Sequence, residues 1–135
     1  MSAPNTSCDN RIDFRLKKRL IDLDRLWTDY CAGEESEGGT LAEYGLCFDY
    51  VAPNTFADQR EGYFRYQLSW GGPSDEFRFF INSDLSCHRV EYWFLDWFDG
   101  ASRILSGGDA RLLLEVCDWF NEIGIVRTDL QQSDR

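Results

Sequence analysis

The chain has 135 residues, of which 43% are hydrophobic and 16% aromatic, so it can bury a core and is unlike a disordered chain. No apolar run approaches the roughly 20 residues of a membrane-spanning helix, and the first residues lack the apolar region of a secretory signal, so we expect a cytoplasmic protein. The net charge of −10 excludes a main body that binds nucleic acid through phosphate contacts, because such contacts need cations.

The charge is unevenly distributed along the chain. Residues 1–31 hold five acids and six bases, whereas the remaining residues hold 19 acids and eight bases, a net charge of −11. An acidic body of this kind attracts a basic partner surface, including a surface that normally holds nucleic acid. Many soluble cytoplasmic proteins are acidic without such a partner, and this alternative stays open.

A first helix is predicted over residues 11–30, where apolar residues recur every three or four positions. The charged residues between them fall mostly on the opposite side, and the cluster Arg15–Arg19 is either a phosphate-binding face or a solvated helix surface. Residues 1–10 form a flexible leader in which Asp9 or Asn10 is the expected N-cap. The apolar stripe consists of Ile12, Leu16, Leu20, Leu23, Trp27 and Tyr30.

An acidic loop and a short strand are predicted next. Residues 31–40 are rich in glycine and glutamate, which is typical of a loop. Its glutamates form either a partner-contact tip or a plain solvated linker. Within residues 41–53, the alternation of Leu46, Phe48 and Tyr50 with Cys47, Asp49 and Val51 predicts a short strand, which is stopped by Pro53. The glutamates of the loop are Glu34, Glu35 and Glu37.

The stretch Gly62–Phe98 is predicted to be a three-stranded antiparallel meander at the centre of the fold. Alternation in its first two strands is typical of a sheet with one face on the core and one in water. Residues 71–75, GGPSD, form the turn between them. The third strand, VEYWFLDW, is apolar on both faces, which indicates a central position or a second face covered by another element or by a partner. The residues expected to share a face within their strands are Phe64, Tyr66, Leu68 and Trp70, then Phe77, Phe79 and Ile81, then Val90, Tyr92 and Phe94.

The C-terminal part is predicted to contain turns and a second helix. Asp99-Gly100 and Gly107-Gly108 are turn signals. A helix then runs from Asp109 to about Ile123, and residues 128–135 form a polar, flexible tail. The whole chain is thus expected to be a single α+β domain, with an antiparallel sheet of about four strands packed against an N-terminal and a C-terminal helix.

No catalytic motif is recognisable, and no cofactor is expected. Five cysteines lack the spacing of a zinc or redox site and are expected to be buried free thiols, with one reactive or paired cysteine left open. His88 is the only histidine, and its neighbour Cys87 points to the opposite face of a strand, so neither a Cys–His pair nor a transition-metal site is indicated. Asp96 and Asp99 flank Trp97; such a carboxylate pair either serves acid–base chemistry or Mg²⁺, or ends the strand and opens a turn.

Aromatic side chains beside carboxylates in the meander favour a protein-binding surface, because tyrosine and tryptophan are preferred interface anchors. Base stacking by the same aromatics would need basic flanks, which the sequence lacks there. Packing of the aromatics in the core is the alternative that stays open. The predicted partner-binding residues are Asp75, Glu76, Glu91, Trp93, Asp96, Trp97 and Asp99 in the meander, and Glu34, Glu35 and Glu37 in the acidic loop.

Two segments, GYFRYQLSWGGPSDEFRFF and VEYWFLDWFDGAS, resemble a group of small acidic uncharacterised accessory proteins of plasmids, integrative conjugative elements and phages. The resemblance extends over residues 41–123 and carries no catalytic motif. It implies a mobile genetic element as the context, and an anti-restriction or anti-CRISPR factor that binds a host defence complex where DNA would bind. No site of that group transfers residue by residue, and the basic first helix departs from a uniformly acidic mimic of nucleic acid.

The leading hypothesis is a non-enzymatic acidic interaction protein that inhibits a host nucleic-acid-targeting defence complex by occupying a basic surface. A small carboxylate-dependent enzyme that uses Asp96 and Asp99, with His88, is the first alternative. A structural module that homodimerises through the meander is the second.

Overall fold

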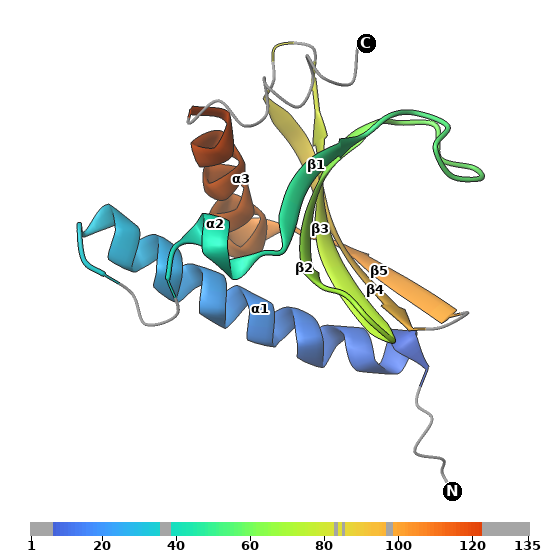
Figure 1. Cartoon of the computed structure of the whole chain (residues 1–135), viewed down its shortest axis with the longest axis horizontal. Helices are drawn as coiled ribbons and strands as arrows, with labels where there is room; N and C mark the ends of the chain where they lie inside the picture. Colours follow the sequence, from blue (N-terminus) through green and yellow to red (C-terminus); the bar gives the residue numbers. More distant parts are fainter. Residues whose placement is uncertain (1–6, 36–38, 83, 85, 97–98, 123–135) are drawn as a thin grey trace, which may run out of the picture.

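The computed structural model describes residues 7–35, 39–82, 84, 86–96 and 99–122. The strands form one antiparallel sheet in the order β1-β2-β3-β4-β5, and the two long helices lie on the same face of this curved sheet (Figure 1). The predicted α+β class and the central meander are confirmed, with five strands in place of about four. In chain order the elements are α1 (Cys8–Cys31), α2 (Leu41–Tyr44), β1 (Cys47–Val51), β2 (Tyr63–Ser69), β3 (Pro73–Ile81), β4 (Cys87–Asp96), β5 (Asp99–Ile104) and α3 (Gly107–Glu122).

The additional strand is β5, which lies where turns were expected. Asp99 pairs with Asp96, and Gly100 pairs with Leu95, so the Asp-Gly dipeptide begins a strand. A Cβ atom on Gly100 would lie only 2.8 Å from Leu95 Cδ2. The glycine therefore permits close packing of two strands, which a sequence pattern does not distinguish from a turn.

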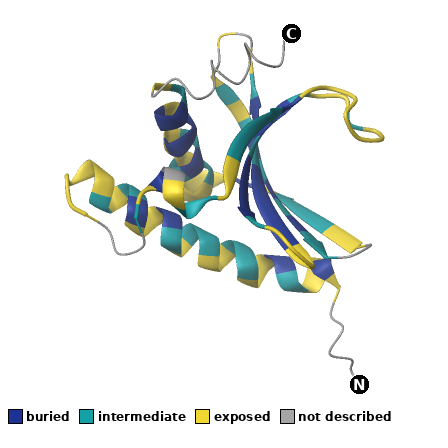
Figure 2. Cartoon of the chain, in the orientation of Figure 1, coloured by how far each residue is buried: buried dark blue, intermediate teal, exposed yellow. Residues whose placement is uncertain are grey.

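The core lies between the sheet and the helices, and Figure 2 shows buried residues along the sheet and on one side of each long helix. The predicted core face is confirmed for most of its residues in β2, β3 and β4, except for Trp70, which is 76% exposed. The expectation that the other face of β2 and β3 meets water is wrong in part, because Tyr63 and Phe80 on that face are buried in a second cluster with Val51. The register between β2 and β3 shifts between Gln67 and Ser69, and β2 ends there, so Trp70 leaves the core face. Core residues include Phe64, Tyr66, Phe77, Phe79, Tyr92 and Phe94 of the sheet, Ile12 and Leu23 of α1, and Leu113, Val116 and Phe120 of α3.

Helix α1 meets the sheet through charged as well as apolar side chains. Arg11, Arg15 and Arg19 follow one another at intervals of four and so share one helix face. The guanidinium carbons of Arg11 and Arg15 lie 4.8 and 5.3 Å from the centre of the Phe94 ring, and Arg19 pairs with Asp75. The expectation that Arg15 and Arg19 face solvent is wrong, because both guanidinium groups turn toward the sheet.

The N-terminus of α1 lies earlier than predicted. The helix begins at Cys8, and the Ser7 hydroxyl accepts a hydrogen bond from the Asn10 amide. Residues 8–10 are therefore helical and are not part of a leader, and Ser7 is the N-cap in place of Asp9 or Asn10.

Two further segments differ from the prediction. Residues 41–44, to which no element was assigned, form the short helix α2, which begins with a reciprocal capping box between Thr40 and Glu43. The short strand predicted after them is confirmed as β1. Helix α3 begins at Gly107, ahead of Asp109. Within the described part of the chain, no helix has the length and hydropathy needed to cross a membrane. The predicted tail of residues 128–135 lies outside the described residues.

Candidate partner-binding surface

Asp75, predicted on the partner surface, has no exposed side-chain surface and lies on the face that α1 covers. Arg19 donates to both of its oxygens, with Nε–Oδ2 2.6 Å and Nη2–Oδ1 2.9 Å. The hydroxyls of Tyr92 and Ser69 also donate to this carboxylate. Burial alone would raise the pKa of Asp75, but these hydrogen bonds hold it below its ordinary value. The prediction for Asp75 is wrong, because its carboxylate neutralises Arg19 inside the fold.

The same network continues into α2. Arg19 Nη1 donates to the Tyr44 hydroxyl at 3.0 Å, and this hydroxyl donates to Asp22 Oδ2 at 2.8 Å. Burial raises the pKa of Tyr44. One chain of hydrogen bonds thus joins β3, α1 and α2.

Asp96 and Asp99, also predicted as partner contacts, hold the beginning of α1. Asp96 Oδ2 pairs with Arg11 Nη1 at 2.6 Å, and Asp99 Oδ2 accepts the Cys8 amide at 2.7 Å. The bond from that amide keeps the pKa of Asp99 below its ordinary value, as expected for a carboxylate at a helix N-terminus. Both carboxylates have intramolecular roles, which removes the reason for placing them in a partner surface.

The carboxylate-dependent enzyme is not supported by this geometry. His88 lies near the beginning of β4 and Asp96 at its end, roughly 25 Å apart at about 3.3 Å per strand residue. His88 Nε2 lies 3.7 Å from Glu61 Oε2 instead. Among the described residues, no three histidine, cysteine or acidic side chains are grouped in a way that could hold a metal ion.

The cysteines differ in environment. Cys8 and Cys117 are buried free thiols as expected, whereas Cys31 and Cys47 are exposed. The hydrogen bond between Cys87 and Cys117 lowers the pKa of Cys87 and raises that of Cys117.

Two predicted contact residues, Glu91 and Trp93, lie partly exposed on the sheet face opposite the helices. Glu76 lies on the same face but is only 4% exposed, so the prediction that it contacts a partner is wrong. Glu76 is opposite Trp93 in neighbouring strands, and Arg78 is opposite Glu91. Glu76 Oε2 accepts Arg78 Nε at 2.7 Å, and Glu91 accepts Arg89 Nε and Trp93 Nε1, each at 2.9 Å. These carboxylates are neutralised by arginines of the same face, so this face carries little net charge.

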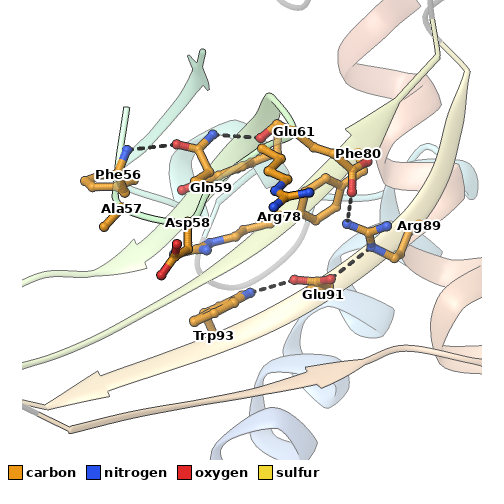
Figure 3. Close-up of a pocket in the computed structure, with 12 residues that line it drawn as sticks. Phe56, Ala57, Asp58, Gln59, Glu61, Arg78, Phe80, Arg89, Glu91 and Trp93 are labelled. Atoms are coloured by element: carbon orange, nitrogen blue, oxygen red, sulfur yellow. Dashed lines mark hydrogen bonds and ion pairs between the residues drawn. The ribbon is translucent and has the colours of Figure 1, made fainter. Parts of the chain in front are cut away.

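Aromatic rings and guanidinium groups alternate on this open face. The Arg78 guanidinium lies 3.9 Å from the Trp93 ring centre and 4.6 Å from that of Tyr63, and Arg89 lies 3.9 Å from the Phe80 ring centre. The loop between β1 and β2 closes one side of a pocket of about 570 Å³ over these residues. Figure 3 shows Phe56 to Gln59 of that loop across from Glu91 and Trp93, with Arg78 between them.

The remaining predicted contacts lie at the other end of the molecule or outside the described residues. Glu34 and Glu35 are exposed. Glu37 and Trp97 lie outside the described residues.

The second half of α1, the short helix α2 and α3 lie together on one side of the molecule (Figure 1), and these segments are rich in acids. Within residues 22–35, 39–44 and 107–122 there are ten acids and two bases, a net charge of −8, and all ten acids are at least partly exposed. We call this surface the acidic end. Its acids are Asp22, Asp24, Asp29, Glu34, Glu35, Glu43, Asp109, Glu115, Asp118 and Glu122.

Aromatic side chains lie at the centre of the acidic end. Tyr30, which is 52% exposed, stacks on Trp27 with ring centres 5.6 Å apart and meets the Trp119 ring edge-on at the same separation. Trp27 Nε1 donates to Glu115 Oε2 at 2.8 Å, whereas Trp119 Nε1 is buried and has no hydrogen-bond partner among the residues that the structure describes. Aromatic and acidic side chains therefore lie together on the helices as well, whereas this combination was predicted in the meander.

Part of this surface carries a sequence signal that pattern reading missed. Glu115, Asp118 and Glu122 are separated by three and four positions, so they share one exposed face of α3. The meeting of that face with the second half of α1 depends on tertiary packing, which sequence spacing does not reveal.

Comparisons with protein-family models, with curated proteins and with solved structures find no match to this chain.

Proposed function

We propose that this protein is a non-enzymatic interaction module whose acidic end docks on a basic surface of a protein partner. The observation that carries the proposal is the net charge of −8 over the described residues of the acidic end. Surface potentials of this kind steer association with an oppositely charged partner. Exposed Tyr30 supplies an aromatic anchor within the acidic end.

The positions of these acids support a role in binding over a role in folding. Neither α1 nor α3 has a base in its last turn, where cations would stabilise a helix. Asp29 and Glu122 occupy those last turns instead. Acids that oppose the helix dipole and also repel one another lower stability, which favours a function for them in recognition.

The finer proposal concerns the partner. A basic surface that attracts this protein is of the kind that otherwise holds nucleic acid. We therefore propose inhibition of a host nucleic-acid-targeting defence complex, of the anti-CRISPR or anti-restriction type, as the function. The open sheet face is the weaker docking candidate, because its carboxylates are already paired with arginines.

Affinity capture from a host lysate tests the proposal, with Asp29→Asn/Asp118→Asn/Glu122→Gln as the acidic-end variant. We expect the wild type to retain a nucleic-acid-binding complex that is released by salt and competed by DNA, and the variant to retain several-fold less. Asp9→Asn/Asp13→Asn/Asp58→Asn is the control with an equal charge change elsewhere, and it should capture as much as the wild type.

Two results would contradict the proposal. Equal loss of capture by both variants would mean that net charge alone matters, and capture that is independent of salt and of the acidic-end variant would place the contact elsewhere. Neutralising Asp75 and Asp96 is an unsuitable test, because both pair with arginines of α1 and their loss would loosen the fold.

A further inference from the structure

A second pocket lies within the acidic end, between the last turns of α1 and the short helix α2. It has a volume of about 330 Å³. Its apolar floor includes Leu26 and Leu41, each only 2% exposed, and Tyr30 stands beside them. Its lining also contains the carboxylates Glu34, Glu35 and Glu43 and, among the described residues, no basic residue.

The carboxylates of this pocket are available to a guest. Glu34 and Glu35 are exposed and form no ion pair or side-chain hydrogen bond with any other residue that the structure describes. Glu43 is exposed as well, although its Oε1 accepts the Thr40 amide. The pocket thus combines a buried apolar surface with exposed carboxylates at its edge.

The residues of the pocket favour one class of bound group. An anion would be repelled by three glutamates, and a purely apolar group would cover carboxylates without pairing them. A bare divalent cation needs several converging oxygens, and no such group exists among the described residues. A cation on an aliphatic stem satisfies both parts, since its methylene groups cover apolar surface while its charged head meets the rim.

We propose that this pocket receives a single lysine or arginine side chain of the protein partner. The inference rests on the proposed function and deepens it, because it identifies the partner's contact as one basic residue inserted beside Tyr30. The volume lies at the lower limit of ligand pockets, which start at about 300 Å³, and suits one long side chain. The exposed ring of Tyr30 offers a cation–π contact to the same group.

The test uses the full ¹⁵N-labelled chain and short capped peptides. Acetyl-Ala-Arg-Ala-amide and its lysine analogue are titrated at about 0.15 M salt while amide shifts are followed. The citrulline and norleucine analogues keep the stem and lack the charge. We expect shifts at Tyr30, Glu34, Glu35, Leu41 and Glu43 with the two charged peptides, and at least about tenfold weaker binding of the neutral ones.

Variants locate the binding. Glu34→Gln/Glu35→Gln should lower the affinity for the charged peptides by about fivefold, because exposed ion pairs are lost. Asp118→Asn/Glu122→Gln makes an equal charge change outside the pocket, so its affinity should stay within about twofold of the wild type. Three results would contradict the proposed binding in the pocket. They are an equal loss of peptide affinity in both variants, amide shifts spread over all acidic residues, and equal affinity for the citrulline and arginine peptides.

The outcome is separable from that of the proposed function. If a basic partner is captured in a salt-sensitive way but the peptides do not bind, the proposed role of the pocket is wrong and the proposed function stands. If the peptides bind at the pocket but no basic partner is captured, the proposed function is wrong and the pocket still binds a basic side chain.

Discussion

At the scale of single residues, Asp75 links the sheet to α1 through its ion pair with Arg19. It accepts hydrogen bonds from Arg19, Tyr92 and Ser69 and is fully buried, whereas the Arg19 side chain is 20% exposed. A charged pair in this setting is favourable only while both partners are present, because an unpaired buried charge is costly. From the sequence, Asp75 was assigned to a turn after two glycines. Its partner Arg19 lies 56 positions away, so no local sequence pattern indicates that the carboxylate is buried.

Asp75→Asn should lower the free energy of unfolding by about 3 to 5 kcal/mol, because Arg19 then lies partly buried without a counter-charge. Urea unfolding measures the change. Asp49→Asn is the matched control: Asp49 pairs with Arg65 at 2.6 Å, but its side chain is 40% exposed, so about 0 to 1 kcal/mol is expected. Similar losses for the two variants would show that burial of the Asp75 pair is unimportant.

The same carboxylate predicts acid sensitivity. The folded-state pKa of Asp75 lies below its ordinary value, so the stabilisation by this group is complete above the ordinary pKa, about 3.9. It is lost as the pH falls through the folded-state pKa. Urea unfolding from pH 6 downward should therefore show a decline below about pH 4 that is shallower in Asp75→Asn. Identical pH profiles for the wild type and the variant would contradict this.

At the scale of elements, most predictions that rest on periodicity were accurate, although Tyr30 and Trp70, assigned to apolar faces, are exposed. The alternation of Phe77 and Phe79 and the helical spacing of Leu23 located a strand face and a helix face correctly. The other errors arose at glycine residues and at charged residues, whose positions depend on tertiary contacts. Gly100 begins β5 in place of a turn, and Arg15 points to the sheet.

Gly45, between α2 and β1, provides a test of such a tertiary constraint. A Cβ atom there would lie 2.9 Å from Tyr66 Cδ1 and 3.1 Å from the Gln67 carbonyl oxygen. Tyr66 is buried and its hydroxyl donates to the Leu41 carbonyl, so it cannot move aside freely. Gly45→Ala should therefore destabilise the protein by about 1 to 3 kcal/mol in urea unfolding.

Gly108→Ala is the control for that variant. Gly108 lies in the first turn of α3, and a Cβ atom there meets nothing within 4 Å. Alanine is the better helix former by up to about 1 kcal/mol, so this variant should be neutral or more stable. A neutral result for Gly45→Ala would mean that β1 shifts to admit the methyl group.

At the scale of the whole molecule, the charge pattern opposes stability at one end and supports it at the other. The beginning of α1 is tied down by pairs such as Arg103 with Asp9 and Asp13. The acidic end has an excess of acids, including Asp118 and Glu122 near the C-terminus of α3. The net charge predicted an acidic surface from the sequence alone, but the location of the acidic end depends on the packing of α3 against α1.

Asp118→Asn/Glu122→Gln should raise the free energy of unfolding by about 0.3 to 1 kcal/mol per residue at low salt, because it removes charges that oppose the helix dipole and repel their neighbours. Asp9→Asn/Asp13→Asn, an equal charge change, should be neutral or destabilising, since Asp9 and Asp13 pair with Arg103. Urea unfolding at about 0.02 M and 0.5 M sodium chloride separates the effects, because screening at the higher salt should shrink both. If neutralising the acidic end lowers stability at low salt, these acids stabilise the fold, and the argument that they are kept for recognition is wrong.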